Sequence, residues 1–296
     1  MSELPCPSYD MYHSQPSEYG TSESGSGTDS FHKFFEGWVV EQNQHLKELV
    51  ASTTTELTDE KLQALIDGVV KHYEYYYEAK SKCAKHDVLA MLSPTWRSSL
   101  EDAFLWIGGW RPSMAFHLLY SKAGLQFEAK LDELLQGLRT SDLGDLSATQ
   151  LAQIDEIQKR TIAEEREITD MMARHQETVA DASMVELSHA VSEMLRANET
   201  DKGGNKEVEE RVDSALMPKE EGLEEILQRA DDLRLRTLQG IVNILRPKQC
   251  IHFLIAAAEL HLRLHEWGKK RDTSRRLNEG TSSDEGTTHD LSTTSR

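Results

Sequence analysis

The sequence predicts an all-α fold, and three observations support this class. Apolar residues recur at steps of three and four along most of the chain, the spacing that gathers them on one face of a helix. Helix-start signals precede several of these segments, as at Ser93-Pro94 and Ser147. No segment shows the alternation of apolar and polar residues between turn signals that marks strands. We expect a multi-helix domain that contains one long helix.

The first helix is expected after a cap at Asp29-Ser30 and the second over residues 58–92. A third helix is expected from Ser93-Pro94, because Ser can cap a helix and Pro loses nothing in the first turn, where its missing N–H has no intrahelical partner. The apolar residues of this third helix are Trp96, Leu100, Phe104 and Ile107.

Gly108 and Gly109 end the third helix in this interpretation, because a helix often stops at a residue with positive φ, which glycine adopts readily. A phosphate-binding loop would need a strand before the glycines and a Lys-Ser/Thr pair after them, and neither is present. We interpret the glycine pair as a helix corner packed by Trp106 and Trp110. Arg111-Pro112 then begins a short helix.

In the C-terminal half, Ser147 should cap a helix of roughly 45–50 residues, well above the ordinary mean length. Its apolar spacing is not a regular heptad, which favours a packed or broken helix over an exposed coiled coil. A flexible polar break is expected at 198–210, followed by a last helix pair, 219–245 and 248–267, divided at Arg246-Pro247.

The two ends of the chain are polar and lack an apolar period. We expect disordered tails at 1–28 and 271–296, which leaves 29–270 as the helical domain. No apolar run approaches the roughly 18 residues that a membrane span requires. The three cysteines are far apart and odd in number, which fits a reducing compartment, so we expect the protein in the nucleus and cytoplasm.

The formal net charge is −18, from 51 acidic and 33 basic residues. Nucleic acid would repel such a chain unless a local basic patch overrode the average. Only Lys269–Arg271 and Arg275-Arg276 approach a basic patch. The simpler interpretation is a solvated helix end, and the alternative is a nuclear-import signal.

One histidine pair stands out among the residues that could carry chemistry. His261 and His265 lie four residues apart, so both side chains project from neighbouring turns of one helical face. They are either two histidines at the rim of a core or a contact for haem or a divalent metal. One intact helix cannot place two imidazoles on opposite faces of a haem, so at most one of them would be an axial ligand. Neither cofactor is required by any other feature of the sequence, and no catalytic constellation is found.

A set of aromatic residues could form either the helical core or the wall of an apolar pocket. Core packing is the simpler interpretation. The set is Trp38, Tyr73, Tyr76, Trp96, Trp106 and Trp110.

Several separated strings resemble one plant family. They are FHKFFEGWVVEQNQHLKEL, KHDVLAMLSPTWRSSLEDAFLWIGGWRPS, LSATQLAQIDEIQ and EGLEEILQRADDLRLRTLQGIVNILRPKQCIHFLIAA, which resemble the Delay-of-Germination domain over roughly residues 31–268. The same domain forms the C-terminal half of TGA-type bZIP transcription factors. The motif residues that carry the resemblance are Trp38, Gln42, Trp96, Trp106, Gly108, Gly109, Trp110, Asp232 and Arg234.

The resemblance implies a non-enzymatic regulator of seed dormancy, abscisic-acid signalling or transcription that acts through protein contacts. The partners it implies are type 2C protein phosphatases or transcription co-regulators. A TGA factor carries a basic region and a leucine zipper ahead of this domain, whereas the first 30 residues here show neither a basic cluster nor heptads. We therefore expect no direct DNA binding; the alternatives are a DNA-binding regulator like the TGA factors and a haem or metal sensor.

Overall fold

The computed structural model describes residues 27–131, 133, 141–197 and 204–282, and confirms the all-α class. Within these residues there is no strand, and the one β-bridge pairs Trp106 with Gly109. The helices are α1 (Gly27–Thr54), α2 (Asp59–Ala84), α3 (Val88–Leu92), α4 (Ser99–Asp102), α5 (Met114–Ala129), α7 (Ala148–Glu177), α8 (Ala182–Ala197), α9 (Gly204–Ile244) and α10 (Pro247–Ser282). Two short 3₁₀ helices are η2 (Leu143–Asp145) and η3 (Thr178–Ala180).

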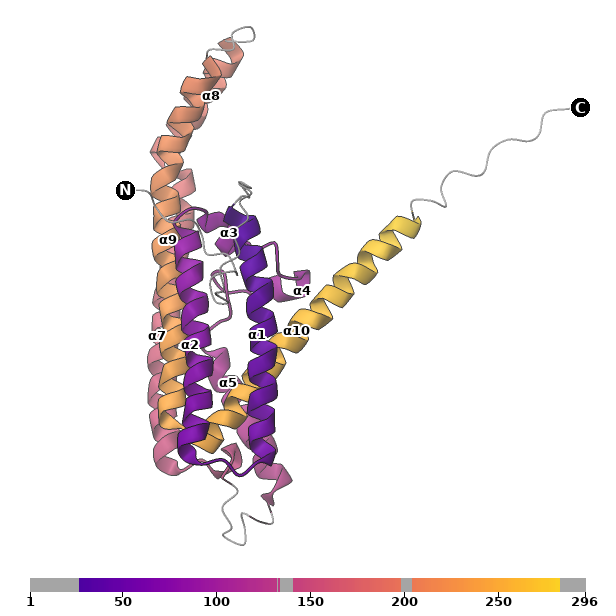
Figure 1. Ribbon diagram of the computed structural model, residues 1–296. Helices are drawn as coiled ribbons and strands as arrows, with labels where there is room; N and C mark the ends of the chain where they lie inside the picture. The colour runs from indigo at the N-terminus through magenta and orange to yellow at the C-terminus, as the bar shows by residue number, and fades with distance from the viewer. Residues whose placement is uncertain (1–26, 132, 134–140, 198–203, 283–296) are drawn as a thin grey trace, which may run out of the picture.

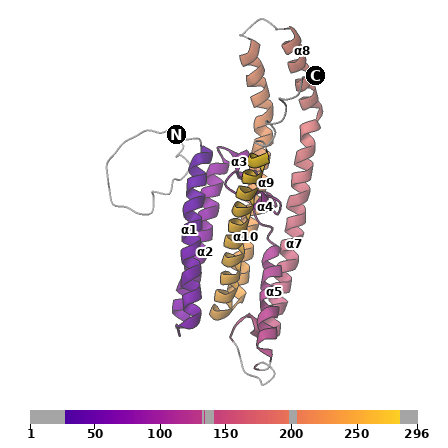
Figure 2. The same cartoon turned by 90° about the vertical axis from the view of Figure 1, so that its right-hand side faces the viewer.

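The body of the molecule is a bundle of long helices (Figure 1). The helices α1 and α2 pack on each other and on α10, while α9 packs between α2 and α7. Helix α5 packs on α10. At one end, α8 and the N-terminal half of α9 rise beyond the bundle as a projecting pair, which we call the arm (Figures 1 and 2). The last turns of α10 leave the bundle in another direction (Figure 1).

The bundle is held by two large apolar clusters. One joins the C-terminal part of α1 to α5, α9 and α10, with Leu49, Phe116, Ile241 and Phe253 fully buried. The other is aromatic and packs the start of α1 against α2 and the segment after α3; its members include Phe31, Phe34, Phe35, Trp38, Tyr76 and Trp96. The Phe31 and Trp96 rings lie 4.9 Å apart, within the range of favourable aromatic pairs.

The structure corrects three expected helix boundaries in the N-terminal half. Helix α1 begins at Gly27, so Asp29-Ser30 is not its cap. The expected helix at 58–92 is two helices, because α2 ends at Ala84 and the Asp87 side chain caps α3 by accepting a hydrogen bond from the Ala90 N–H. Ser93 ends α3 and does not start a helix.

The third helix is reduced to the four residues of α4. The cap of α4 is Ser98, two residues after Trp96, and Ser98 forms a capping box with Glu101. Trp96 therefore lies in the turn before α4 and reaches the aromatic cluster, a position that a helix starting at Ser93 would not give it. Phe104, expected on the apolar face of that helix, is 61% exposed.

The C-terminal half differs from expectation in where the long helix lies. Ser147 caps α7, as expected, and forms a capping box with Gln150. The helix ends at Glu177, where η3 follows, so it is shorter than expected. The longest helix is α9, of 41 residues, which contains Pro218. A flexible break is expected at 198–210, but residues 204–210 are helical. The ion pair between Lys206 and Glu210, one turn apart, supports this part of the helix. Residues 198–203 lie outside the described residues.

The last helix pair divides near Arg246-Pro247, where α9 ends and α10 begins. Helix α10 continues to Ser282, so residues 271–282 of the expected C-terminal tail are helical. Asp272 accounts for part of this extension, because its carboxylate accepts hydrogen bonds from the backbone N–H (2.9 Å) and hydroxyl of Ser99. Residues 1–26 and 283–296 of the expected tails lie outside the described residues.

No helix in the described part of the chain is both long enough and apolar enough to cross a lipid bilayer.

Candidate functional site: a buried arginine network and an apolar pocket

The Gly108-Gly109 pair forms a tight turn, not the helix corner that the sequence suggested. The Trp106 N–H donates to the Gly109 carbonyl (2.8 Å) and the Gly109 N–H donates to the Trp106 carbonyl (3.2 Å). Ile107 and Gly108 have φ of 46° and 65°, both left-handed, as a type I′ turn requires. A β-branched residue in this region is strained, so surrounding contacts must hold Ile107 there.

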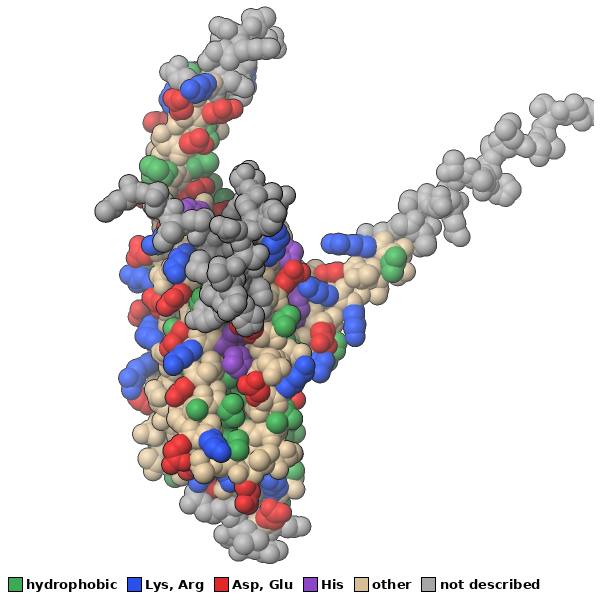
Figure 3. Space-filling model, in the orientation of Figure 1, with side chains coloured by type: hydrophobic (Ala, Val, Ile, Leu, Met, Phe, Trp, Pro, Cys, Tyr) green, Lys and Arg blue, Asp and Glu red, His purple; other side chains and the backbone are tan. Residues whose placement is uncertain are grey.

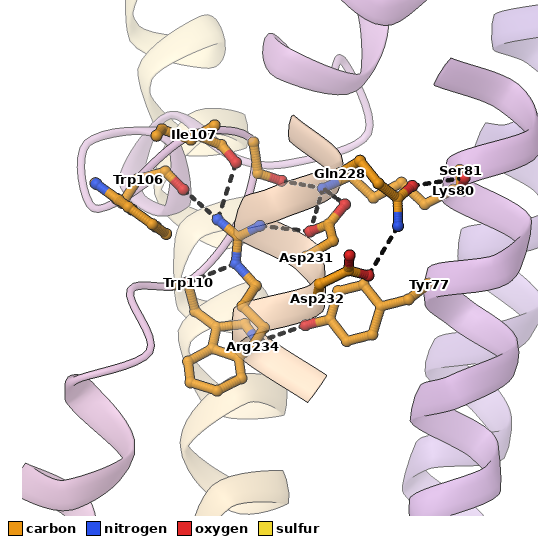
Figure 4. Close-up of polar contacts among 11 residues, drawn as sticks. Tyr77, Lys80, Ser81, Trp106, Ile107, Trp110, Gln228, Asp231, Asp232 and Arg234 are labelled. Atoms are coloured by element: carbon orange, nitrogen blue, oxygen red, sulfur yellow. Dashed lines mark hydrogen bonds and ion pairs between the residues drawn. The ribbon is translucent and has the colours of Figure 1, made fainter. Parts of the chain in front are cut away.

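Those contacts come from Arg234 of α9, whose side chain is fully buried against the turn (Figure 4). Its Nε donates to the Trp110 carbonyl (2.7 Å), and its Nη2 donates to the carbonyls of Ile107 (2.9 Å) and Trp106. Its Nη1 pairs with Asp231. The turn thus closes around the guanidinium and presents three backbone carbonyls to it.

Lys80 of α2 completes the network from the other side. Its Nζ donates to the Gly108 carbonyl (2.9 Å) and pairs with the Asp231 carboxylate (3.0 Å). Burial lowers the pKa of Lys80 to about 8, although the negative charge of Asp231 opposes that shift. We call Lys80, Asp231, Arg234 and the turn 106–110 the Arg234 network.

Neither glycine of the turn has room for a side chain. A Cβ on Gly109 would lie 2.7 Å from the Arg234 Cζ, and one on Gly108 would lie 2.6 Å from the Met91 carbonyl oxygen. The charged groups are paired and the turn carbonyls accept hydrogen bonds from protein donors, so the network offers no open position to a substrate. Its chemistry is structural: it ties α2, α9 and the turn together.

An apolar pocket of about 180 Å³ lies on the other side of Trp110. The Trp110 Nε1 donates to the Tyr77 hydroxyl (2.8 Å), and both residues line the pocket while bordering the Arg234 network (Figure 4). Residues of α1, α2, α5, α9 and α10 and of the segment 97–105 form the rest of the wall, which is mostly aromatic and aliphatic. The charged or titratable groups at the polar end are Arg97, Glu101 and His261.

The two histidines singled out in the sequence take different positions on α10. His261 lines the pocket, with its ring 5.6 Å from the ring of Trp38. His265 is buried, and its Nδ1 lies 3.0 Å from both carboxylate oxygens of Glu101. Burial alone would raise the pKa of Glu101, but the contacts from His265 and Ser98 outweigh it and hold the pKa at about 2.

Haem or metal binding at His261 and His265 stays a prediction. Among the described residues, no group of three or more His, Cys, Asp or Glu side chains is arranged to hold a metal ion. Of the two histidines, His261 lines the pocket, so a haem would have to bind there. The pocket has a volume of about 180 Å³, which is below the roughly 300–1,000 Å³ of pockets for drug-sized ligands. The pocket would have to widen to admit it.

Two further motif residues, Trp38 and Gln42, position α1 against α2. The Trp38 ring stacks on the His72 ring at 4.6 Å, and its Nε1 donates to the His72 carbonyl (3.1 Å). Gln42 is buried and donates to the Tyr73 hydroxyl (3.0 Å). Asp232, in contrast, is exposed and accepts a hydrogen bond from Gln228, one turn earlier on α9.

Buried histidines make the stability of the fold sensitive to pH. Burial, with the neighbouring His45, lowers the pKa of His72 from 6.5 to about 3, and burial, with the charge of Arg97, lowers that of His261 to about 4. The unfolded chain therefore binds more protons than the folded one below pH 6.5, so stability falls as the pH falls.

Between pH 6.5 and 5 we expect the unfolding free energy to drop by up to about 1.4 kcal/mol per pH unit for each of these histidines. Urea denaturation across this range measures the slope. His72→Phe keeps a ring against Trp38 and should give a shallower slope, whereas the exposed His117→Phe should not change it. An unchanged slope in His72→Phe would contradict the assignment.

Sequence reasoning missed Lys80, Asp231 and Arg97. Asp231 stands beside the two motif residues Asp232 and Arg234, so helical phase on α9 could have identified it as the inward-facing carboxylate. Lys80 gave no such signal, because it lies in a polar run and lysine is rarely buried unless it is paired.

Comparison with known proteins places this architecture in a family. The family model described as "DOG1: Seed dormancy control" matches residues 45–121. Protein DOG1-like 3 of Arabidopsis thaliana is 32% identical over 266 residues, which cover 86% of this chain and 90% of that protein. Protein DOG1-like 4 of the same plant is 32% identical, with 82% of this chain and 94% of that protein covered.

A transcription factor is among the similar proteins as well. Transcription factor TGA5 of Arabidopsis thaliana is 29% identical over 254 residues, covering 86% of this chain and 68% of that protein. Of the motif residues that suggested the resemblance, Trp38 and Trp96 lie in the aromatic cluster, and Trp106, Gly108, Gly109, Trp110 and Arg234 lie in the Arg234 network. The chain belongs to the DOG1-like family of plant regulatory proteins, whose domain the TGA transcription factors share.

Proposed function

We propose that the protein is a non-enzymatic regulator that acts through protein–protein contact, in seed dormancy, abscisic-acid signalling or transcription. Type 2C protein phosphatases and transcription co-regulators are the partner classes that we propose to test, and the nucleus and cytoplasm are the proposed locations. Membership of the DOG1-like family supports the regulatory role. The observation that carries the contact proposal is the surface of the arm.

Apolar side chains are exposed at the base of the arm, in η3 and in α9. Val179 is 64% exposed and Met217 58% exposed. The backbone around Val179 lies against this part of α9, because Lys219 binds both the Thr178 carbonyl (2.9 Å) and the Asp181 carboxylate (2.8 Å) on either side of Val179. The stem of the arm shows hydrophobic side chains among charged ones (Figure 3). Exposed apolar surface that is gathered into a patch marks an interaction site, and we infer such a patch at the base of the arm.

A pull-down from imbibed seed extract, read by mass spectrometry, tests this proposal. We expect wild-type protein to retain a phosphatase or a co-regulator and the double variant Val179→Glu/Met217→Glu to lose it, because two buried carboxylates would oppose the contact. Val40→Glu, at a 66% exposed valine of α1 outside the arm, is the matched control and should retain the partner. A double variant that captures the same partners as wild type would contradict the assignment to the arm.

Direct DNA binding is the rival function, favoured by the similarity to Transcription factor TGA5. With a formal net charge of −18, this chain should not shift a duplex containing TGACG at near-physiological salt, since electrostatic attraction to phosphate supplies most non-specific affinity. A gel-shift titration measures this directly. A sequence-specific shift at micromolar protein, lost on a scrambled duplex, would establish the rival instead.

A further inference from the structure

The apolar pocket has the features of a small-molecule site. Its walls include the rings of Trp38, Tyr76, Trp110 and Phe253, contributed by different segments of the chain. Its volume of about 180 Å³ is slightly above that of an engineered cavity of roughly 150 Å³ that binds benzene. A ligand with one or two flat rings fits this volume. Aromatic walls favour flat rings through stacking and edge contacts.

The pocket wall contains one arginine and no lysine, and the arginine is incompletely paired. Arg97 lies in the turn before α4, and its Nε is buried without a hydrogen-bond partner among the described residues. Leaving a donor of a charged group buried and unpaired is unfavourable, so a ligand that supplies an acceptor gains free energy there. The Tyr76 hydroxyl hydrogen-bonds to the Arg97 side chain and the charge of Glu101 acts on it, and the Phe35 ring lies 5.9 Å from its Cζ, but none of these pairs with the Nε.

The carboxylate nearest to this end of the pocket is already engaged. Glu101 accepts hydrogen bonds from the N–H (2.9 Å) and hydroxyl (2.7 Å) of Ser98 and contacts His265. His261, on the same wall, is a neutral imidazole at pH 7, since burial lowers its pKa to about 4, and can donate or accept one hydrogen bond. Arg97 is therefore the charged group of this wall that still has a donor to offer a ligand.

A guanidinium binds a carboxylate through two parallel hydrogen bonds, and a single negative charge is less costly to bring into an apolar cavity than a phosphate dianion. We propose that the pocket binds a compact aromatic monocarboxylate, with its carboxylate at Arg97 beside His261 and its rings between the aromatic side chains. The exposed Phe104, Met114 and Leu260 line the rim and give an apolar entrance. The proposal does not depend on the partner contact at the arm.

The test is a titration of the full chain at pH 7 with 2-naphthoate, and separately with neutral 2-naphthamide. Binding is followed by tryptophan fluorescence, because Trp38 and Trp110 line the pocket. We expect saturable naphthoate binding with a Kd below about 1 mM and at least about tenfold weaker binding of the amide, as a charge-assisted bond predicts. Absence of saturation, or equal binding of the amide, would overturn the proposal.

Variants then assign the site. Arg97→Gln should weaken naphthoate binding at least about tenfold, while Arg263→Gln, which removes one positive charge from the exposed side of α10, should leave it unchanged. Ala257→Leu fills the pocket from α10 without touching a charge, and should also abolish binding. If Arg97→Gln does not fold, Ala257→Leu decides the question: retained binding in this variant places naphthoate elsewhere and overturns the proposal.

Discussion

Arg234→Leu is expected to lower the free energy of unfolding by about 3–5 kcal/mol, the range seen when one partner of a buried charged network is removed. The substitution leaves the carbonyls of Ile107 and Trp110 without their donor, while the Trp106 carbonyl keeps only the Gly109 N–H (3.2 Å). Each unpaired buried group carries a desolvation penalty of roughly 1–3 kcal/mol. Asp231 keeps its pairing with Lys80, which limits the loss.

Urea denaturation followed by tryptophan fluorescence measures the effect, and the chain supplies a matched control two residues away. Arg236 has a side chain that is 57% exposed and pairs with Glu164 on the surface at 2.7 Å. Exposed ion pairs of this kind contribute about 0–1 kcal/mol, so Arg236→Leu should cost no more than that. If Arg234→Leu and Arg236→Leu lower the free energy of unfolding equally, the buried network contributes no more to stability than an exposed ion pair.

Gly109→Ala is expected to cost about 1–3 kcal/mol, as overpacking of a well-filled site does. The added Cβ would meet the Arg234 Cζ at 2.7 Å and Nε at 2.8 Å. The guanidinium cannot retreat, because it is held by three carbonyls and Asp231.

The control for Gly109→Ala is Gly124→Ala, at an exposed glycine of α5 where an added Cβ has no neighbour within 4 Å. Since alanine favours a helix over glycine, this variant should be about 0.5–1 kcal/mol more stable than wild type. Both variants are measured by the same urea denaturation. A Gly109→Ala protein as stable as wild type would contradict the tight fit of the turn.

Periodicity predicted most of the fold because it reports burial of helix faces, and burial dominates helix placement in this bundle. The apolar residues expected on the first helix, such as Phe31, Trp38 and Leu49, are buried in α1. Apolar periodicity did not predict the helices correctly over residues 85–113, because polar contacts determine the path of the chain there. The aspartate cap at Asp87 separates α3 from α2, and the capping box at Ser98 reduces the next expected helix to α4.

The role of the glycine pair could not be found from local signals. A glycine after an apolar period predicts a helix end, and the same residues serve a type I′ turn. What distinguishes the two is Arg234, more than 120 residues away in sequence. The family resemblance identified both the glycine-tryptophan block and the block that contains Arg234, but it did not predict that the two are in contact. This contact is visible only in the folded chain.

These observations lead to a central claim: the family's glycine-tryptophan block and its arginine block form one structural unit. The most direct measurement is a double-mutant cycle of Gly109→Ala and Arg234→Leu, with unfolding free energies from urea denaturation. The three atoms nearest to a Cβ on Gly109 all belong to the Arg234 guanidinium, beyond the point where leucine ends. We predict that Gly109→Ala becomes nearly harmless in the Arg234→Leu background, a coupling of about 1–3 kcal/mol. Additive losses would contradict the claim.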